Sequence, residues 1–174
     1  KCESIPDYVI ESILICWIKM ESLNDFGDCV VLEIRDLLML CDHTLTKTAK
    51  AFILYTWGCI HFARDEACQS MRCYSACIEC DPKYFVAHID RAIILTEKFS
   101  RPTEAIQCLS HAIKFIPDVA RLFADRGSIY AGGCLDQTNA LKDFSTSIRL
   151  DPTNPYVYNN RGALLVDLQL FEAA

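Results

Sequence analysis

The sequence predicts an all-α protein built from helical hairpins that stack into an α-solenoid. Three observations support this class: prolines recur every 35 residues, small residues recur at nearly the same period, and Gly and Pro number only six each. So little Gly and Pro disfavours an all-β fold, which needs many tight turns. A period of about 20–50 residues is typical of repeat architectures, in which one copy cannot bury its apolar face alone.

Composition narrows the class of protein further. The chain has 174 residues, of which 52% are hydrophobic and 23% charged, enough apolar content for a packed core. The net charge is −6, from 17 Lys and Arg against 23 Asp and Glu, so we expect no nucleic-acid or membrane-surface binding. The longest apolar run, residues 8–20, is too short to span a bilayer. Because the sequence begins with Lys1 and stops inside a predicted helix, we expect a fragment of a longer protein.

Each predicted helix follows from a small residue at its centre. The first helix of every hairpin has a large residue four positions before the small one and another three positions after it, which places them on one face. The second helix has small, large and small residues at i, i+4 and i+7, and a proline after its last turn ends it. The central small residues of the first helices are Gly58, Ala92, Gly127 and Gly162. The terminating prolines are Pro82, Pro117 and Pro152.

These patterns set the expected helix boundaries. First helices are predicted over 51–63, 85–97, 120–131 and 155–167, and second helices over 66–80, 103–115 and 138–149. The second and third copies have one extra residue between their helices. Residues 1–49 do not keep the period, and their two apolar stretches predict a degenerate or capping helical hairpin. The alternative for this segment is a separate helical interaction element.

The clearest copy runs from Phe123 through Gly127 and Tyr130 to Phe144 and Pro152. This pattern resembles the tetratricopeptide repeat (TPR) family, and the resemblance covers residues 50–174. It implies a right-handed solenoid with three repeats and the first helix of a fourth. The sequence departs from the family pattern at Ser70, Cys77, His88 and Ala92.

The resemblance also implies that the first helices line a concave groove. A polar residue stands two positions before each central small residue, which predicts a ladder of hydrogen-bonding groups for an extended peptide that carries Lys or Arg. The ladder consists of Thr56, Asp90, Asp125 and Asn160. Neighbours expected on the same face are Tyr55, Ile89, Asn159, Ile93 and Ser128. The alternative is that the aspartates only pair with arginines and solvate this face.

We therefore predict a protein-interaction scaffold, with no enzymatic activity and no cofactor. Two alternatives stay open: a substrate-recruiting arm of an enzyme encoded elsewhere in the chain, and an architectural segment of a large ciliary or cytoskeletal assembly. Some arrays of this family clamp the terminal carboxylate of chaperones. Asn160 fits one position of that clamp, but Ala124 and Ser128 stand where Lys and Asn are required, so the clamp is not expected.

The eleven cysteines are odd in number, and most lie in apolar helical stretches. They are expected to be reduced thiols in an intracellular, cytoplasmic protein. Cys73, Cys77 and Cys80 share one helical face and could bind zinc, but two of them occupy packing positions, so we predict no metal. His61 and His88 also occupy packing positions and are predicted to be core histidines rather than bases.

Overall fold

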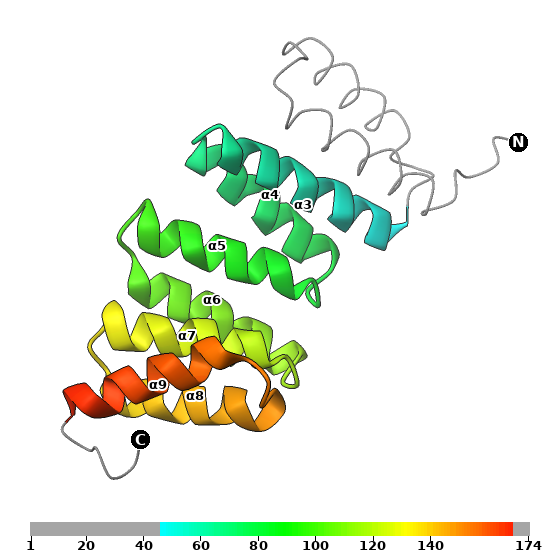
Figure 1. The fold of residues 1–174 in the computed structure, drawn as a ribbon. Coiled ribbons are helices and arrows are strands. Elements are labelled where there is room, and N and C mark those ends of the chain that lie inside the picture. The colour runs from blue at the N-terminus through cyan, green and yellow to red at the C-terminus, as the bar shows by residue number, and fades with distance from the viewer. Residues whose placement is uncertain (1–45, 169–174) are drawn as a thin grey trace, which may run out of the picture. The chain divides into compact units, whose positions relative to one another are not determined.

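The computed structural model describes residues 46–168, and all regular structure in this range is α-helical (Figure 1). The chain divides into two compact units, Lys1–Asp81 and Pro82–Ala174, which are described separately. The described part of the first unit consists of α3 (Lys47–Ala63) and α4 (Ala67–Cys80). The second unit contains α5 (Phe85–Glu97), α6 (Pro102–Phe115), α7 (Ala120–Gly132), α8 (Gln137–Leu150) and α9 (Pro155–Asp167).

The predicted helices are confirmed with small changes at their ends. Helices α5 and α9 match the predicted ranges, whereas α3 begins four residues earlier than predicted. The early start has a local cause, because the Thr46 side chain caps α3 by accepting a hydrogen bond from the Ala49 amide. Apart from residues 46–49, the predicted hairpin over 1–49 lies outside the described residues, as do residues 169–174.

In the first unit, α3 and α4 form one hairpin that closes over Gly58. A Cβ atom at this glycine would lie 2.3 Å from the ring of Tyr74, so only glycine lets the aromatic ring sit against the α3 backbone. The hydroxyl of Ser70 donates a 2.8 Å hydrogen bond to the Gly58 carbonyl and holds α4 at this close approach. The ring of Tyr55 stacks on Tyr74 with centroids 5.7 Å apart.

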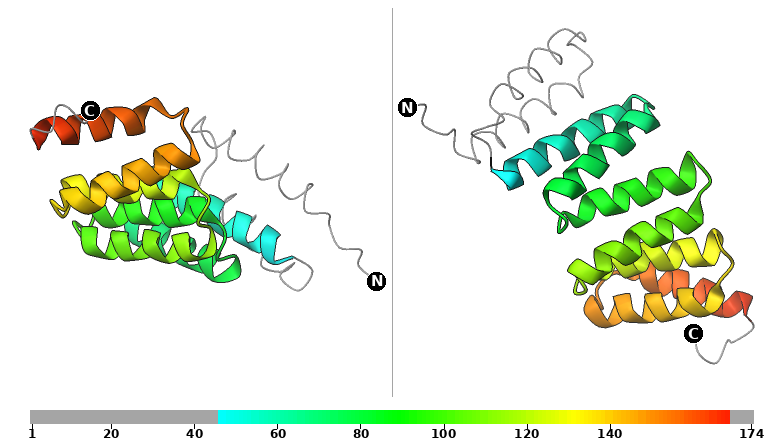
Figure 2. Two further views of the ribbon diagram at one scale, coloured as in Figure 1. Left: turned by 90° about the horizontal axis from the view of Figure 1, so that it is seen from below. Right: turned by 180° about the vertical axis from the view of Figure 1, so that it is seen from behind.

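In the second unit, two hairpins and a further helix stack in chain order (Figures 1 and 2). Helix α6 packs against α7, and α8 packs against α9. The first helices α5, α7 and α9 also contact one another in sequence, so they form one continuous row. Leu109, Leu122 and Phe144 are buried in this unit, and Leu109 and Phe144 occupy the large-residue position of the second helices that the repeat period predicts. In the first helices the corresponding large residues are less buried, since Phe123 is half-buried and Tyr158 is exposed.

The connections between the two helices of each hairpin contain residues with a left-handed backbone, which the sequence pattern does not predict. Three residues adopt left-handed backbone conformations, Asp65 with φ 60°, Ser100 with φ 53° and Leu135 with φ 52°. They stand at equivalent points, 35 residues apart, where the chain turns from the first helix to the second. None is a glycine, so the helices on both sides must hold this unfavourable conformation.

The close approach predicted at the third copy is confirmed. A Cβ atom on Gly127 would lie 2.9 Å from two ring carbons of Phe144, and the glycine itself is buried. The same prediction for Gly162 is not tested, because a Cβ atom there would meet nothing within 4 Å among the described residues and the helix expected to pack on it lies outside them. Helix α9 is the last described helix, and the residues that follow Leu168 are outside the described range.

These two glycines provide a matched test of helix packing. Gly127→Ala is expected to lower the free energy of unfolding by about 1–3 kcal/mol, because the added methyl group overpacks the contact with Phe144. Gly162→Ala is expected to raise it by about 0.5–1 kcal/mol, since alanine favours the helix and meets no neighbour. Urea unfolding followed by circular dichroism measures both, and equal shifts in the two variants would contradict the packing of α7 on α8.

An ion pair links the two helices of the α7–α8 hairpin, and its arginine also reaches the preceding hairpin. Arg126 on α7 donates through Nε and Nη2 to the two carboxylate oxygens of Asp143 on α8, at 2.7 and 2.8 Å. Its remaining Nη1 donates to the hydroxyl of Ser110 on α6 at 2.9 Å. The Asp143 carboxylate raises the pKa of Arg126 further, so the guanidinium stays charged. One side chain thus connects α6, α7 and α8.

Removing the acid of this pair should be costly. Asp143→Ala leaves the Arg126 charge half-buried without its carboxylate, and we expect a loss of about 3–5 kcal/mol in the free energy of unfolding. Asp118→Ala is the control, because Asp118 is exposed in the connection between α6 and α7. Chemical denaturation of both variants checks the prediction. A loss at Asp143 no larger than that at Asp118 would show that the pair is dispensable.

Candidate functional site

Four polar residues of the predicted groove lie on the row of first helices in the second unit. Asp90 on α5 and Asp125 on α7 are half-buried, whereas Ser128 on α7 and Asn160 on α9 are exposed. The Nδ2 group of Asn160 donates a long hydrogen bond to the Ser128 hydroxyl, with 3.5 Å between the two heavy atoms. We call these four residues the polar row. It spans the three first helices α5, α7 and α9, each of which contacts the next first helix.

The two carboxylates of the polar row influence each other. Burial raises the pKa of the Asp125 carboxyl, the positive charge of Arg121 opposes that rise, and the negative charge of Asp90 adds to it. The buried Oδ2 atom of Asp125 lies 3.5 Å from Nε of Arg121, which is too long for a well-formed hydrogen bond. The Asp125 carboxylate is thus poorly solvated and incompletely hydrogen-bonded, so an added cation next to it would favour its charged form.

Two other predicted groove residues are buried and do not offer side chains to a partner. Thr56 is 2% exposed, and its hydroxyl donates to the Phe52 carbonyl within α3. Ile89 is 0% exposed and belongs to the core of the second unit. Both point inward because the buried stripe of the helix is wider than the repeat pattern indicates. Thr56 also belongs to the first unit, so the candidate surface is confined to α5, α7 and α9.

The remaining predicted neighbours differ in their environments. Tyr55 is half-buried and packs on Tyr74 inside the first hairpin. Ile93 is half-buried on α5, one turn after Asp90, and Asn159 is exposed on α9 beside Asn160. Ile93 and Asn159 therefore stay candidates for the surface around the polar row.

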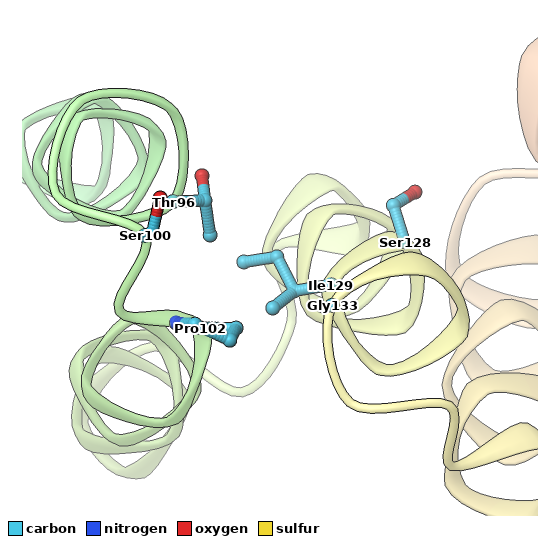
Figure 3. Close-up of a pocket in the computed structure, with 6 residues that line it drawn as sticks. All are labelled: Thr96, Ser100, Pro102, Ser128, Ile129 and Gly133. Atoms are coloured by element: carbon cyan, nitrogen blue, oxygen red, sulfur yellow. The ribbon is translucent and has the colours of Figure 1, made fainter.

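A hollow of about 490 Å³ opens between the α5–α6 connection and the last turns of α7 (Figure 3). The side chains of Thr96, Pro102 and Ile129 are directed towards the gap between these segments (Figure 3). Its lining residues are Thr96, Ser100, Pro102, Ser128, Ile129 and Gly133. Of these, sequence reasoning selected only Ser128. The extra residue in the α5–α6 connection is the one sequence signal that could have indicated the others.

Buried polar groups also surround His88, as its packing position predicts. The ring is 1% exposed, and its Nε2 atom lies 3.1 Å from the Pro82 carbonyl oxygen, to which the neutral ring donates. Its Nδ1 atom is 3.9 Å from the sulfur of Cys108, and Arg91 approaches the same sulfur at 3.9 Å. Burial lowers the pKa of His88 and the Pro82 hydrogen bond opposes it, while the positive charges of His111 and Arg91 add to the lowering.

The buried imidazole should make stability depend on pH. Because the pKa of His88 is lower in the folded chain than the usual 6.5, the unfolded chain binds more protons. The free energy of unfolding is therefore expected to be fully present above that pH and to fall as the pH drops below it. His88→Phe should weaken this dependence strongly, whereas His111→Gln at an exposed position, which removes only a smaller cause of the lowered pKa, should weaken it much less. Denaturation series across this pH range would contradict the prediction if His88→Phe left the slope unchanged.

The other cysteine and histidine side chains singled out in the sequence lie in packing positions or pair with a neighbour. Cys77 is fully buried, and burial with nearby Cys80 raises its pKa to about 12, so the thiol is held protonated. His61 is predicted to be a core histidine but is only half-buried. Its Nδ1 atom lies 2.6 Å from a carboxylate oxygen of Glu66. Within residues 46–168 no group of three or more His, Cys, Asp or Glu could hold a metal ion, and metal-free folding stays a prediction. No helix in this range is long and apolar enough to cross a membrane.

Comparison with solved structures identifies the fold. The first TPR domain of Spaghetti (RPAP3), bound to the HSP90 peptide SRMEEVD, superimposes with a TM-score of 0.64 at 19% identity and covers 71% of this chain and 97% of that one. MamA from Desulfovibrio magneticus RS-1 gives 0.68 at 16% identity, over 96% and 88%. The N-terminal domain of stress-induced protein-1 (STI-1) from C. elegans gives 0.61 at 16% identity, over 69% and 98%.

No protein-family model matches the chain, and no curated protein matches it. At these identities the structural likeness establishes the fold alone. The chain has the TPR fold, an all-α solenoid of helical hairpins, as the sequence predicts.

Proposed function

We propose that the chain is a non-catalytic protein-interaction scaffold that binds an extended, basic segment of a partner protein along the polar row. The observation that carries this proposal is the half-buried Asp125 carboxylate, whose Oδ2 atom has no hydrogen-bond partner and whose pKa is raised by burial and, to a smaller extent, by the negative charge of Asp90 on the neighbouring helix. A Lys or Arg side chain placed beside Asp125 supplies the hydrogen-bond donor that its buried Oδ2 atom lacks.

The rest of the polar row suits the main chain of such a segment. Asn160 and Ser128 are exposed on adjacent helices, and together they provide donors and acceptors at the spacing of the helix row. The hydrogen bond between them is long at 3.5 Å and therefore weak. Replacing it by hydrogen bonds to a ligand should cost little free energy. The surface thus combines a charged anchor with groups that recognise peptide bonds without regard to sequence.

The same electrostatics argue against an acidic ligand. The peptide SRMEEVD bound by the RPAP3 domain contains two glutamates and a terminal aspartate. Here a peptide of that kind would bring carboxylates towards Asp90 and Asp125, and like charges in an interface are repulsive. Chaperone-type acidic tails are therefore expected to bind poorly, in agreement with the missing Lys and Asn of the carboxylate clamp at Ala124 and Ser128.

Selection of a displayed random peptide library on the chain tests the proposal. Recovered peptides are expected to be rich in Lys and Arg, and their affinity should fall as salt rises. Asp90→Asn, Asp125→Asn and Asn160→Ala combined should weaken binding by roughly 5–150-fold, the equivalent of one to three lost hydrogen bonds. The peptide SRMEEVD serves as the acidic comparison and should not bind.

Two controls separate binding from folding and from net charge. The triple variant should keep its helix content, because asparagine has nearly the same volume as the two half-buried aspartates that it replaces and Asn160 is exposed. Asp118→Asn with Asp167→Asn removes the same number of charges at exposed positions outside the polar row and should leave affinity unchanged. If the selected peptides bind the triple variant as tightly as the original chain, the polar row is only a solvated face and the proposal fails.

A further inference from the structure

The connection between α7 and α8 holds a leucine in two unfavourable circumstances at once. Leu135 has a left-handed backbone with φ 52°, which a glycine or asparagine adopts more readily. Its side chain is 79% exposed, more than any other large hydrophobic residue that the structure describes. Neither the backbone nor the packing of its own chain therefore calls for leucine at this position. Such a combination favours a contact with another molecule.

The hollow between the α5–α6 connection and α7 lies at the same end of the hairpins as Leu135. Gly133, two residues before Leu135, lines the hollow, and so does Ile129 in the last turns of α7. The amides of Cys134 and Asp136 donate to carbonyls of these last turns at 3.2 and 2.9 Å, which folds the connection back on the end of α7. Because Leu135 is so exposed, it does not fill the hollow of its own chain.

The hollow is suited to a hydrocarbon side chain. The hydroxyl of Thr96 donates to two carbonyls of its own helix at 2.9 and 3.1 Å, which leaves its methyl group for a ligand. The hydroxyl of Ser128 likewise donates within α7 at 3.0 Å. Pro102 and Ile129 add hydrocarbon surface (Figure 3). Burial of an aliphatic side chain is thus more favourable here than burial of a polar one, and about 490 Å³ leaves room for it.

A projecting leucine and an apolar hollow on one edge make that edge self-complementary. When two copies meet about a twofold axis, Leu135 of each copy can enter the hollow of the other, and the contact closes with two chains. The charges agree with this arrangement. Arg101 borders the hollow, is 60% exposed and has only a long ion pair with Glu104, at 3.4 Å. Asp136 follows Leu135 and keeps its negative charge uncompensated in its hydrogen bonds to Asn139, which is neutral.

We propose that the chain forms a symmetric dimer in which Leu135 of each copy is seated in the hollow of the other. This edge consists of two connections and the helix ends beside them, so the interface is small and the dimer weak, with a dissociation constant of about 10 µM to 1 mM. The inference does not rest on the proposed function, because Leu135 does not belong to the polar row.

Sedimentation equilibrium of the 174-residue chain up to about 1 mM tests the dimer. Leu135→Asn is expected to raise the dissociation constant about a hundredfold, because each of the two buried leucines contributes about tenfold. The same substitution should stabilise the monomer, since asparagine tolerates the left-handed backbone. Tyr156→Asn is the control, because Tyr156 is 77% exposed on α9, away from this edge, and its replacement should leave the dissociation constant unchanged.

Mixing two variants tests whether the hollow receives the leucine. Thr96→Phe fills the hollow and should weaken the dimer about as much as Leu135→Asn does. In a mixture, the intact leucine of the Thr96→Phe chain can enter the intact hollow of the Leu135→Asn chain. One of the two contacts is thereby restored, so the mixed dimer should be about tenfold tighter than either variant alone. Sedimentation velocity with one variant labelled at its N-terminus measures the mixed species.

Three results would overturn the proposal: a chain that stays monomeric at about 1 mM, a dimer that survives Leu135→Asn, or two dissociated variants that do not associate when mixed. Circular dichroism shows whether Thr96→Phe keeps its helix content. If it does not, Thr96→Leu is the smaller substitution with the same expected direction, and the mixing experiment is decided with that variant. Each of these results leaves peptide binding along the polar row unaffected, so the proposed function is judged separately.

Discussion

The bidentate pair between Arg126 and Asp143 is the contact on which the second unit depends most. Its carboxylate is buried, its two hydrogen bonds measure 2.7 and 2.8 Å, and its half-buried arginine also reaches Ser110 on the preceding hairpin. The rings of Phe123 and Tyr130 lie about the guanidinium at 5.7 and 6.0 Å, so cation–π attraction adds to the pair. A helix can shift along an apolar contact without losing it. The directed hydrogen bonds of Arg126, in contrast, are satisfied in only one orientation of α7.

The equivalent contact one hairpin earlier is built from different chemistry. Arg91 stands 35 residues before Arg126, and Cys108 stands 35 residues before Asp143. Here the guanidinium meets a thiol at 3.9 Å, and its buried Nε has no hydrogen-bond partner. His88 packs against the same thiol. The two hairpins therefore share a fold but not a stabilising interaction, and the earlier one relies on apolar packing around a titratable ring.

The repeat period predicts the helices well because it reports packing. A small residue such as Gly127 must face a large one such as Phe144, and a proline after the second helix must end it, so both features appear directly in the sequence. The period is less informative about residues at the edge of the buried face and in the connections between helices. Thr56 occupies the same slot as Asp125 yet is buried, and the left-handed residues at Ser100 and Leu135 carry no glycine signal. Partner choice at Arg126 also depends on three-dimensional neighbours.

The polar row exists because consecutive residues on a helix point about 100° apart. In α5, α7 and α9 each residue of the series Asp90, Asp125 and Asn160 is followed directly by a half-buried arginine. The packing that fixes the arginine thereby directs the preceding side chain to the other side of the row. Where tryptophan replaces arginine after Thr56, the wider buried stripe takes in both residues. A polar surface on this fold thus follows from the packing of its arginines.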